Sequence, residues 1–119
     1  MDHKDLDAWR QAMILVEEVY KITSKFPKHE QYGLISQVRR AAVSIPSNLS
    51  EGAARNGNKE FHNFLGISLG SLAELETQMI IAGRLDYADV SGVLALLSRV
   101  RALLIGLRRR IQGTYTQAI

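Results

Sequence analysis

The stretch FHNFLGISLGSLAELETQMIIA, residues 61–82, decides the fold class of this chain. Its apolar and small residues recur at alternating steps of four and three, the spacing that turns one face of an α-helix toward a partner. This pattern predicts a helix over about residues 59–83. Because glycine weakens an isolated helix, we expect Gly66 and Gly70 to allow close approach of a neighbouring helix. The seam consists of Phe61, Leu65, Ser68, Leu72, Leu75, Met79 and Ala82.

Three further segments share this helical spacing, and they predict helices over about residues 5–25, 30–54 and 88–112. The first should end at Phe26-Pro27, because the residue before a proline is pushed out of the α region. Four helices of similar length joined by short loops pack as an antiparallel bundle. We therefore predict one all-α domain over residues 1–119, an up-and-down four-helix bundle.

Pro46 lies inside the second segment, where it removes one backbone donor. The apolar spacing is unbroken across it, which favours one kinked helix over two separate ones. Ser44, Ser47 and Asn48 are available to satisfy the freed backbone groups. We therefore predict a kinked second helix.

The first segment carries two apolar stripes, whereas a helix in a monomeric bundle usually needs only one. One stripe runs from Leu6 to Thr23 through Trp9, and the other runs from Ala8 to Phe26. Two interpretations stay open: both stripes belong to one broad core face, or the second stripe packs against another subunit. On the second interpretation the candidate interface residues are Ala8, Leu15, Val19 and Ile22.

Composition sets the broad class of the protein. With 119 residues, 46% of them hydrophobic and 23% charged, the chain is long enough for one folded domain. The absence of cysteine excludes disulfides, thiolate zinc sites and cysteine nucleophiles. The N-terminus lacks a secretory signal, and no uninterrupted apolar run approaches the roughly 18 residues of a membrane span. We expect a cytoplasmic protein without a membrane association.

Catalytic and metal motifs are missing, including phosphate-binding glycine loops, the HExxH zinc motif and the nucleophile elbow. The three histidines, His3, His29 and His62, are expected at the surface. One catalytic alternative remains, because the spacing of Arg55 and His62 resembles the Arg-x(4 to 6)-His pattern of HEPN-type ribonucleases. That pattern is loose, and we therefore predict a non-enzymatic protein without a cofactor or a metal.

The positive charge of the chain is concentrated near its C-terminus. Residues 99–119 hold five arginines and no acid, so a net charge of +3 leaves −2 for the rest. Arg101 and Arg108 are seven apart and share one side of a helix, with Arg109 beside them. Such a strip could follow a nucleic-acid backbone, although a solvated helix end that complements the helix dipole explains it equally well.

A second pair of arginines, Arg39 and Arg40, lies on the second segment. Adjacent residues on a helix point about 100° apart, so at least one of the two is free for a partner. The candidate residues for nucleic-acid binding are Arg39, Arg40, Arg101, Arg108 and Arg109.

Several motifs in order along the chain resemble one known family. They include Asp5-Leu6-Asp7-Ala8-Trp9, Ser44-Ile45-Pro46-Ser47-Asn48 and Gly70-Ser71-Leu72-Ala73-Glu74-Leu75-Glu76-Thr77. The chain is similar to four-helix-bundle proteins encoded by intervening sequences of bacterial 23S ribosomal RNA, often labelled ribosomal-protein-like. The resemblance implies a ring of five subunits, a homopentamer. It also implies a relation to accessory proteins of diversity-generating retroelements, which bind nucleic acid and a reverse transcriptase. It implies no catalytic residue.

The leading hypothesis is therefore a non-enzymatic, oligomeric bundle that binds RNA or DNA through backbone contacts. The alternatives are a scaffold that binds a protein partner without nucleic acid, and the HEPN-like ribonuclease.

Overall fold

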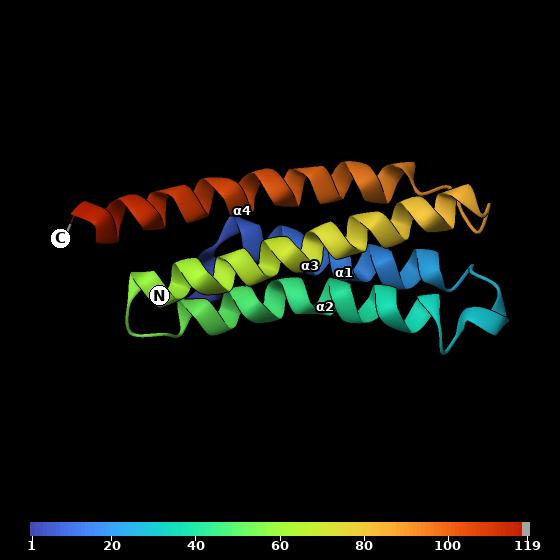
Figure 1. Ribbon diagram of the computed structural model, residues 1–119, viewed down its shortest axis with the longest axis horizontal. Helices are drawn as coiled ribbons and strands as arrows, with labels where there is room; N and C mark the ends of the chain where they lie inside the picture. The colour runs from blue at the N-terminus through green and yellow to red at the C-terminus, as the bar shows by residue number, and fades with distance from the viewer. Residues whose placement is uncertain (118–119) are drawn as a thin grey trace.

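Four long helices make up the computed structural model, which describes the backbone of residues 1–117 and the side chains of residues 1–114 (Figure 1). They are α1 (Asp7–Thr23), α2 (Leu34–Ala53), α3 (Asn58–Arg84) and α4 (Ser91–Gln117). Two short 3-10 helices, η1 (His3–Asp5) and η2 (Lys28–Glu30), precede α1 and α2. No strand occurs in residues 1–117, so the described part of the chain is all-α, as predicted.

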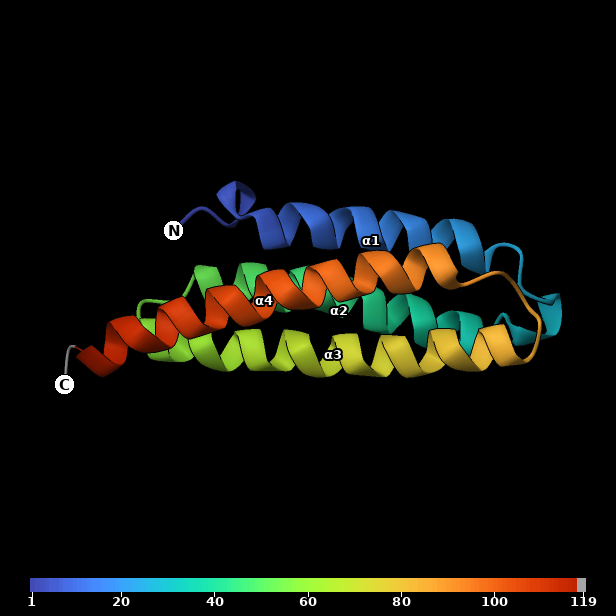
Figure 2. The ribbon, with the colours of Figure 1, turned by 90° about the horizontal axis from the view of Figure 1, so that it is seen from above.

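Consecutive long helices run in opposite directions along one axis (Figures 1 and 2). Each helix contacts two others: α1 and α3 both pack against α2 and against α4. The described molecule measures 51 × 22 × 20 Å, which fits four helices side by side. The C-terminal turns of α4 extend past the loop between α2 and α3 (Figure 2).

The helix ends differ from the predicted bounds for local reasons. The second helix starts at Leu34 rather than near residue 30, because Glu30 belongs to η2 and its Oε1 accepts the Leu34 N–H at 3.3 Å. The fourth helix starts at Ser91, whose N–H donates to Asp89 Oδ1 at 3.0 Å, and it continues to Gln117, beyond the predicted residue 112. Side-chain acceptors thus set both starts.

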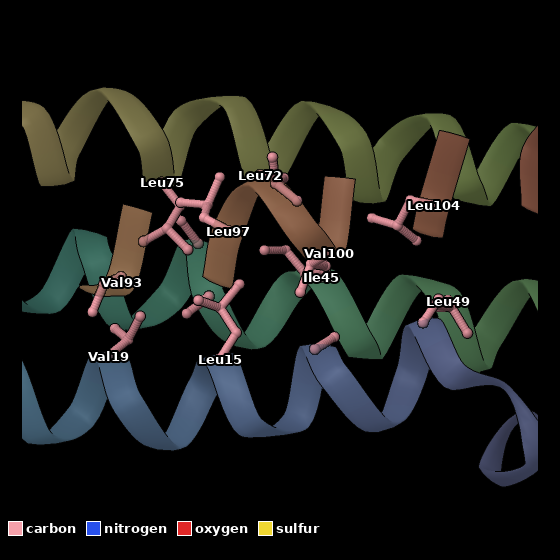
Figure 3. Packing of buried hydrophobic residues seen from close by; sticks show 14 of the residues in the cluster. Leu15, Val19, Ile45, Leu49, Leu72, Leu75, Val93, Leu97, Val100 and Leu104 are labelled. Carbon is pink, nitrogen blue, oxygen red and sulfur yellow. The ribbon is translucent and has the colours of Figure 1, made fainter. Parts of the chain in front are cut away.

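The core runs along the whole axis and takes side chains from all four helices (Figure 3). Every residue of the predicted α3 seam is buried, with exposed fractions of 2% or less. Burying one large aliphatic side chain stabilises the fold by about 1.5–3 kcal/mol. The facing residues include Leu15 and Val19 of α1, Ile45 and Leu49 of α2, and Val93, Leu97, Val100 and Leu104 of α4.

The stripe of α1 that was assigned to a subunit interface faces the core of the bundle, and the other stripe is partly exposed. The proposed interface residues are core residues, with exposed fractions of 4% for Ala8, 0% for Leu15 and Val19, and 8% for Ile22. They are covered by the chain's own helices and offer no surface to a second copy, so this assignment is corrected. In the other stripe, Met13 is 37% and Tyr20 is 42% exposed.

The second helix continues through Pro46, which is buried. Polar side chains bond to backbone carbonyls on both sides of it: Ser47 Oγ donates to the Val43 carbonyl at 2.8 Å and Asn48 Nδ2 to the Ser44 carbonyl at 2.9 Å. The prediction of one helix rather than two is therefore confirmed, while the kink stays a prediction.

The glycines of α2 and α3 have different surroundings. A Cβ on Gly52 would lie 2.6 Å from Phe64 Cβ, so α2 and α3 approach closely there. A Cβ on Gly66 would lie 2.7 Å from an Arg108 guanidinium nitrogen, so a side chain from α4 covers this glycine. A Cβ on Gly70 would meet nothing within 4 Å. The predicted close approach of a helix is therefore found at Gly52 instead, whereas Gly66 is covered by a long side chain and Gly70 by nothing in the described chain.

Candidate nucleic-acid interface

The fourth helix positions all five C-terminal arginines. Its inner side is anchored in the core by six buried residues, and no acidic residue occurs between Ser91 and Gln117. Because successive residues turn by about 100°, the arginines point to different sides of this anchored helix. The buried residues are Val93, Leu97, Val100, Leu104, Leu107 and Ile111.

Arg101 and Arg108 face α3 and are held there. An Arg101 guanidinium nitrogen lies 2.9 Å from Glu76 Oε1, in an ion pair whose side chains are 32% and 35% exposed. Arg108 Nε donates to the His62 carbonyl at 3.2 Å, and its guanidinium lies over Gly66. Two of the three arginines of the predicted strip are therefore engaged within the bundle, and the third, Arg109, is exposed.

Three other arginines point away from the core. Arg99, Arg109 and Arg110 are exposed, and their guanidiniums make no ion pair or hydrogen bond with any side chain in residues 1–114. Arg99 and Arg110 are eleven residues apart and so lie within about 20° of each other on the helix. Ala102 and Gly106, both small, lie between them and Arg109. We call these five residues the α4 outer face.

Two acidic residues lie beside this face. Arg110, Ala102 and Gly106 line a groove of about 300 Å³ together with Asp5 of η1 and Asp7 at the start of α1. Asp7 is already paired with Arg10. Arg99 and Arg109 do not line this groove, so they are the two arginines of the face that lie away from it.

Arg99 and Arg110 belong to the predicted basic C-terminus but not to the predicted binding strip. Spacing among the arginines favours Arg101 and Arg108, which do share one side of the helix. The angle from the apolar seam singles out only Arg109, which lies about 160° from the middle of the seam. Arg101 and Arg108 lie about 60–80° from it on the flank that faces α3, whereas Arg99 and Arg110 lie about 100–120° from it on the other flank, so the sequence alone does not say which flank is covered.

The pair on α2 divides in the same way. Arg39 Nε donates to Thr23 Oγ1 at 2.9 Å, and its guanidinium stacks 4.4 Å from the centre of the Tyr20 ring. It therefore ties α2 to the last turn of α1. Arg40 is exposed, in agreement with the expectation that at least one of the two is free for a partner.

The residues of the ribonuclease alternative lie on opposite flanks of α3. Arg55 pairs with Glu51 at 3.0 Å and stacks on Phe64, with 5.0 Å between its guanidinium carbon and the ring centre. His62 faces α4. Its pKa is lowered from 6.5, first by burial and then by the charge of Arg108, while a hydrogen bond with Gln112 acts in the opposite direction. Since His62 and Phe64 are two residues apart, they point about 160° apart, and no common site forms.

Metal ligands are also dispersed. Among the residues whose positions are described, no group of three or more histidine, aspartate or glutamate side chains could hold a metal ion.

Comparisons with known proteins identify a family and a fold. The family model described as 23S rRNA-intervening sequence protein matches residues 4–107. A crystal structure described as a protein with unknown function from the S23 ribosomal protein family of Bacteroides thetaiotaomicron VPI-5482 superposes with a TM-score of 0.77. The match covers 92% of this chain and 99% of that one at 17% identity, so it supports the fold alone. No protein among the curated ones matches this chain.

Proposed function

This chain belongs to the 23S rRNA-intervening sequence protein family, and we propose that it is a non-enzymatic bundle that binds nucleic acid and assembles with copies of itself. The family match ends at residue 107, before Arg108, Arg109 and Arg110. These three arginines therefore lie outside the matched region. The proposed binding surface is the α4 outer face.

The exposed, unpaired arginines of that face carry the proposal. A guanidinium binds a phosphate through two parallel hydrogen bonds, and a side chain already in an ion pair has less to offer. Ala102 and Gly106 line the groove that holds Asp5 and Asp7, so the proposed phosphate contacts are made chiefly by Arg99 and Arg109, which do not line it. Contacts of this kind position a nucleic acid without reading its sequence.

Self-association would multiply this face. The family resemblance implies a ring of five, in which each copy adds three exposed arginines to one particle, so a weak site becomes a strong electrostatic field. The resemblance to retroelement accessory proteins extends the proposal to a reverse transcriptase as a partner of this chain. The proposed location is the cytoplasm, and neither a cofactor nor a metal is part of the proposal.

Fluorescence anisotropy of labelled RNA and DNA duplexes tests the binding. Nuclease-treated protein should bind at about 50 mM salt and lose most of its affinity at about 200 mM, because phosphate contacts release counterions. Absence of binding at the lower salt would contradict the proposal. Gel analysis of the same RNA after incubation tests the ribonuclease alternative, which requires cleavage that His62→Ala abolishes.

A protein scaffold is the second candidate function, and it is favoured by Tyr32, whose side chain is 92% exposed on the approach to α2. Exposed tyrosines are common in protein interfaces. This candidate predicts no binding of either duplex at any salt concentration.

A further inference from the structure

The third helix carries a second stripe that nothing in the described chain covers. Its residues recur at steps of four and three, like those of the buried seam, but they point to solvent. Ile67 is 50% exposed and Ile81, in the last turn of α3, is 44% exposed, so two large apolar side chains of this stripe face solvent. We call this stripe the α3 ridge; it consists of Asn63, Ile67, Gly70, Glu74, Thr77 and Ile81.

Gly70 at the centre of the ridge has no explanation within one chain. A glycine inside a helix costs stability relative to alanine, and it is usually retained where a neighbour comes close. Gly52 has such a neighbour, whereas nothing lies within 4 Å of a Cβ on Gly70, as is also true of Gly92 and Gly113 in α4. Gly70 differs from those two in its place at the centre of the ridge, between Ile67 and Glu74, where the open space leaves room for a contact from outside the chain.

The isoleucines of the ridge also contribute to the high mean hydropathy of α3. This helix is the one segment among the described residues that is long and apolar enough, by length and composition, to cross a membrane. Only 33% of that window is buried in the bundle, and the exposed large apolar residues of α3 are Ile67, Ile80 and Ile81. Apolar surface of this kind marks a contact with a protein or a lipid.

A second apolar surface lies on a different side of the bundle, between α1 and α2. There, Tyr20, Tyr32, Ile35 and Val43 line a groove of about 500 Å³, and no acid lines it. Met13 lies seven residues before Tyr20 on the same flank of α1 and is 37% exposed, so the apolar surface continues along the helix. We call this surface the α1–α2 groove.

Ridge and groove are complementary in shape and in charge. One is a single convex helix and the other is concave, the arrangement by which an apolar helix face docks in a groove. The charged residue of the ridge is Glu74, whereas those of the groove are Arg39 and Arg40. Within one chain Arg40 and Glu74 line the adjoining groove between α2 and α3, yet no ion pair joins them there.

We propose that the α3 ridge of one copy docks into the α1–α2 groove of the next copy. The two surfaces differ, so each copy in a pair still has one of them free, and further copies add until a ring closes. The inference rests on the self-association in the proposed function and is independent of nucleic-acid binding.

Two double variants test this contact by analytical ultracentrifugation of nuclease-treated protein. Ile67→Lys with Ile81→Lys disables the ridge, and Tyr32→Lys with Val43→Lys disables the groove. All four side chains are at least 40% exposed, so the bundle should still fold. Wild type should sediment as an oligomer of more than two copies, and each double variant should sediment at the monomer mass of 13.3 kDa.

Mixing the two double variants gives the sharpest result. One keeps an intact groove and the other an intact ridge, so an equimolar mixture should form a one-to-one dimer. The matched control is Ile14→Lys, because Ile14 is 43% exposed but lies outside both surfaces, and it should leave the oligomer unchanged. Gly70→Gln should also give monomers, since it adds a side chain where one chain has open space.

Three outcomes would overturn the inference. A monomeric wild type would remove the self-association as well, although duplex binding could still be present. An oligomer that survives either double variant, or a mixture that stays monomeric, would exclude this contact while leaving self-association intact. Binding of monomeric wild type to phosphatidylcholine vesicles, abolished by Ile67→Lys and Ile81→Lys, would assign the ridge to a lipid surface.

Discussion

Arg108 and Arg109 are neighbours in the sequence but have different surroundings, because one step along a helix turns a side chain by about 100°. Arg108 lies against α3 and donates to the His62 carbonyl, whereas Arg109 is exposed. The same step separates Arg39, which is bonded to Thr23, from Arg40. At the scale of a residue, position relative to the core decides which arginine is available to a ligand.

Gly52 should tolerate no side chain. In Gly52→Ala the new Cβ would meet the Phe64 Cβ at 2.6 Å and the Cδ1 of the buried Phe61 at 3.0 Å, neither of which is the free end of a flexible side chain. We expect a decrease of about 1–3 kcal/mol in the free energy of unfolding, measured by urea denaturation. Gly92→Ala is the control, since a Cβ there has open space, and it should gain up to about 1 kcal/mol. Equal effects would contradict a close approach of the two helices at Gly52.

His62 should make the fold sensitive to mild acid. Burial, and then Arg108, disfavour the imidazolium and lower the pKa of His62 from 6.5 in the folded chain. The unfolded chain therefore binds more protons below that pH, so stability is complete above about pH 7 and falls toward pH 5. The drop in Tm between these two pH values should be smaller in His62→Gln. An identical drop in both proteins would show that His62 is not the responsible group.

At the scale of the elements, polar contacts join the helices at their ends. Tyr87 Oη donates to Glu30 Oε2 at 2.8 Å and so joins the turn before α4 to the turn before α2. This bond lowers the pKa of Glu30 and raises that of Tyr87. The long helices are held by the seam along their length and by a few polar contacts of this kind at their ends.

The sequence was sufficient to predict four helices and the buried seam of α3, because the 3.6-residue period records which residues share a face. It was insufficient to say which of two stripes on α1 faces inward, since both have the same period. Helix ends were also missed where a side chain outside the helix sets them, as Glu30 and Asp89 do. The site prediction combined Arg101 and Arg108, which α3 engages, with Arg109, which is exposed, because the spacing of the arginines does not say which flank of α4 is covered.

Arg39 should contribute to stability by joining α2 to α1. Arg39→Ala removes the bond to Thr23 Oγ1 and the stacking on Tyr20, so the free energy of unfolding should fall by about 1–2 kcal/mol. Arg109→Ala is the control, because it removes the same charge from an exposed position outside the ridge and the groove and should change stability by less than about 0.5 kcal/mol. Urea denaturation of both variants at one protein concentration decides, and equal decreases would exclude the proposed tie.

At the scale of the whole molecule, the surfaces are distributed around the bundle. The α4 outer face is basic, the α3 ridge exposes two isoleucines beside Glu74, and the α1–α2 groove combines apolar and aromatic residues with Arg39 and Arg40. In the proposed assembly the ridge and the groove are buried between copies, while the α4 outer face stays exposed. Assembly and nucleic-acid binding thus use different residues, so each can be removed without the other.

The most direct test of the proposed function compares two triple variants that remove the same charge. Arg99→Ala, Arg109→Ala and Arg110→Ala change the α4 outer face, whereas Lys25→Ala, Lys28→Ala and Arg84→Ala remove three exposed charges at the opposite end of the bundle. Duplex affinity is measured by anisotropy over a series of salt concentrations. We predict weaker binding and a shallower salt dependence for the first variant, by about 0.9 in log–log slope for each phosphate that is no longer neutralised, and near wild-type values for the second. Equally weakened binding in both variants would contradict a phosphate-binding face on α4.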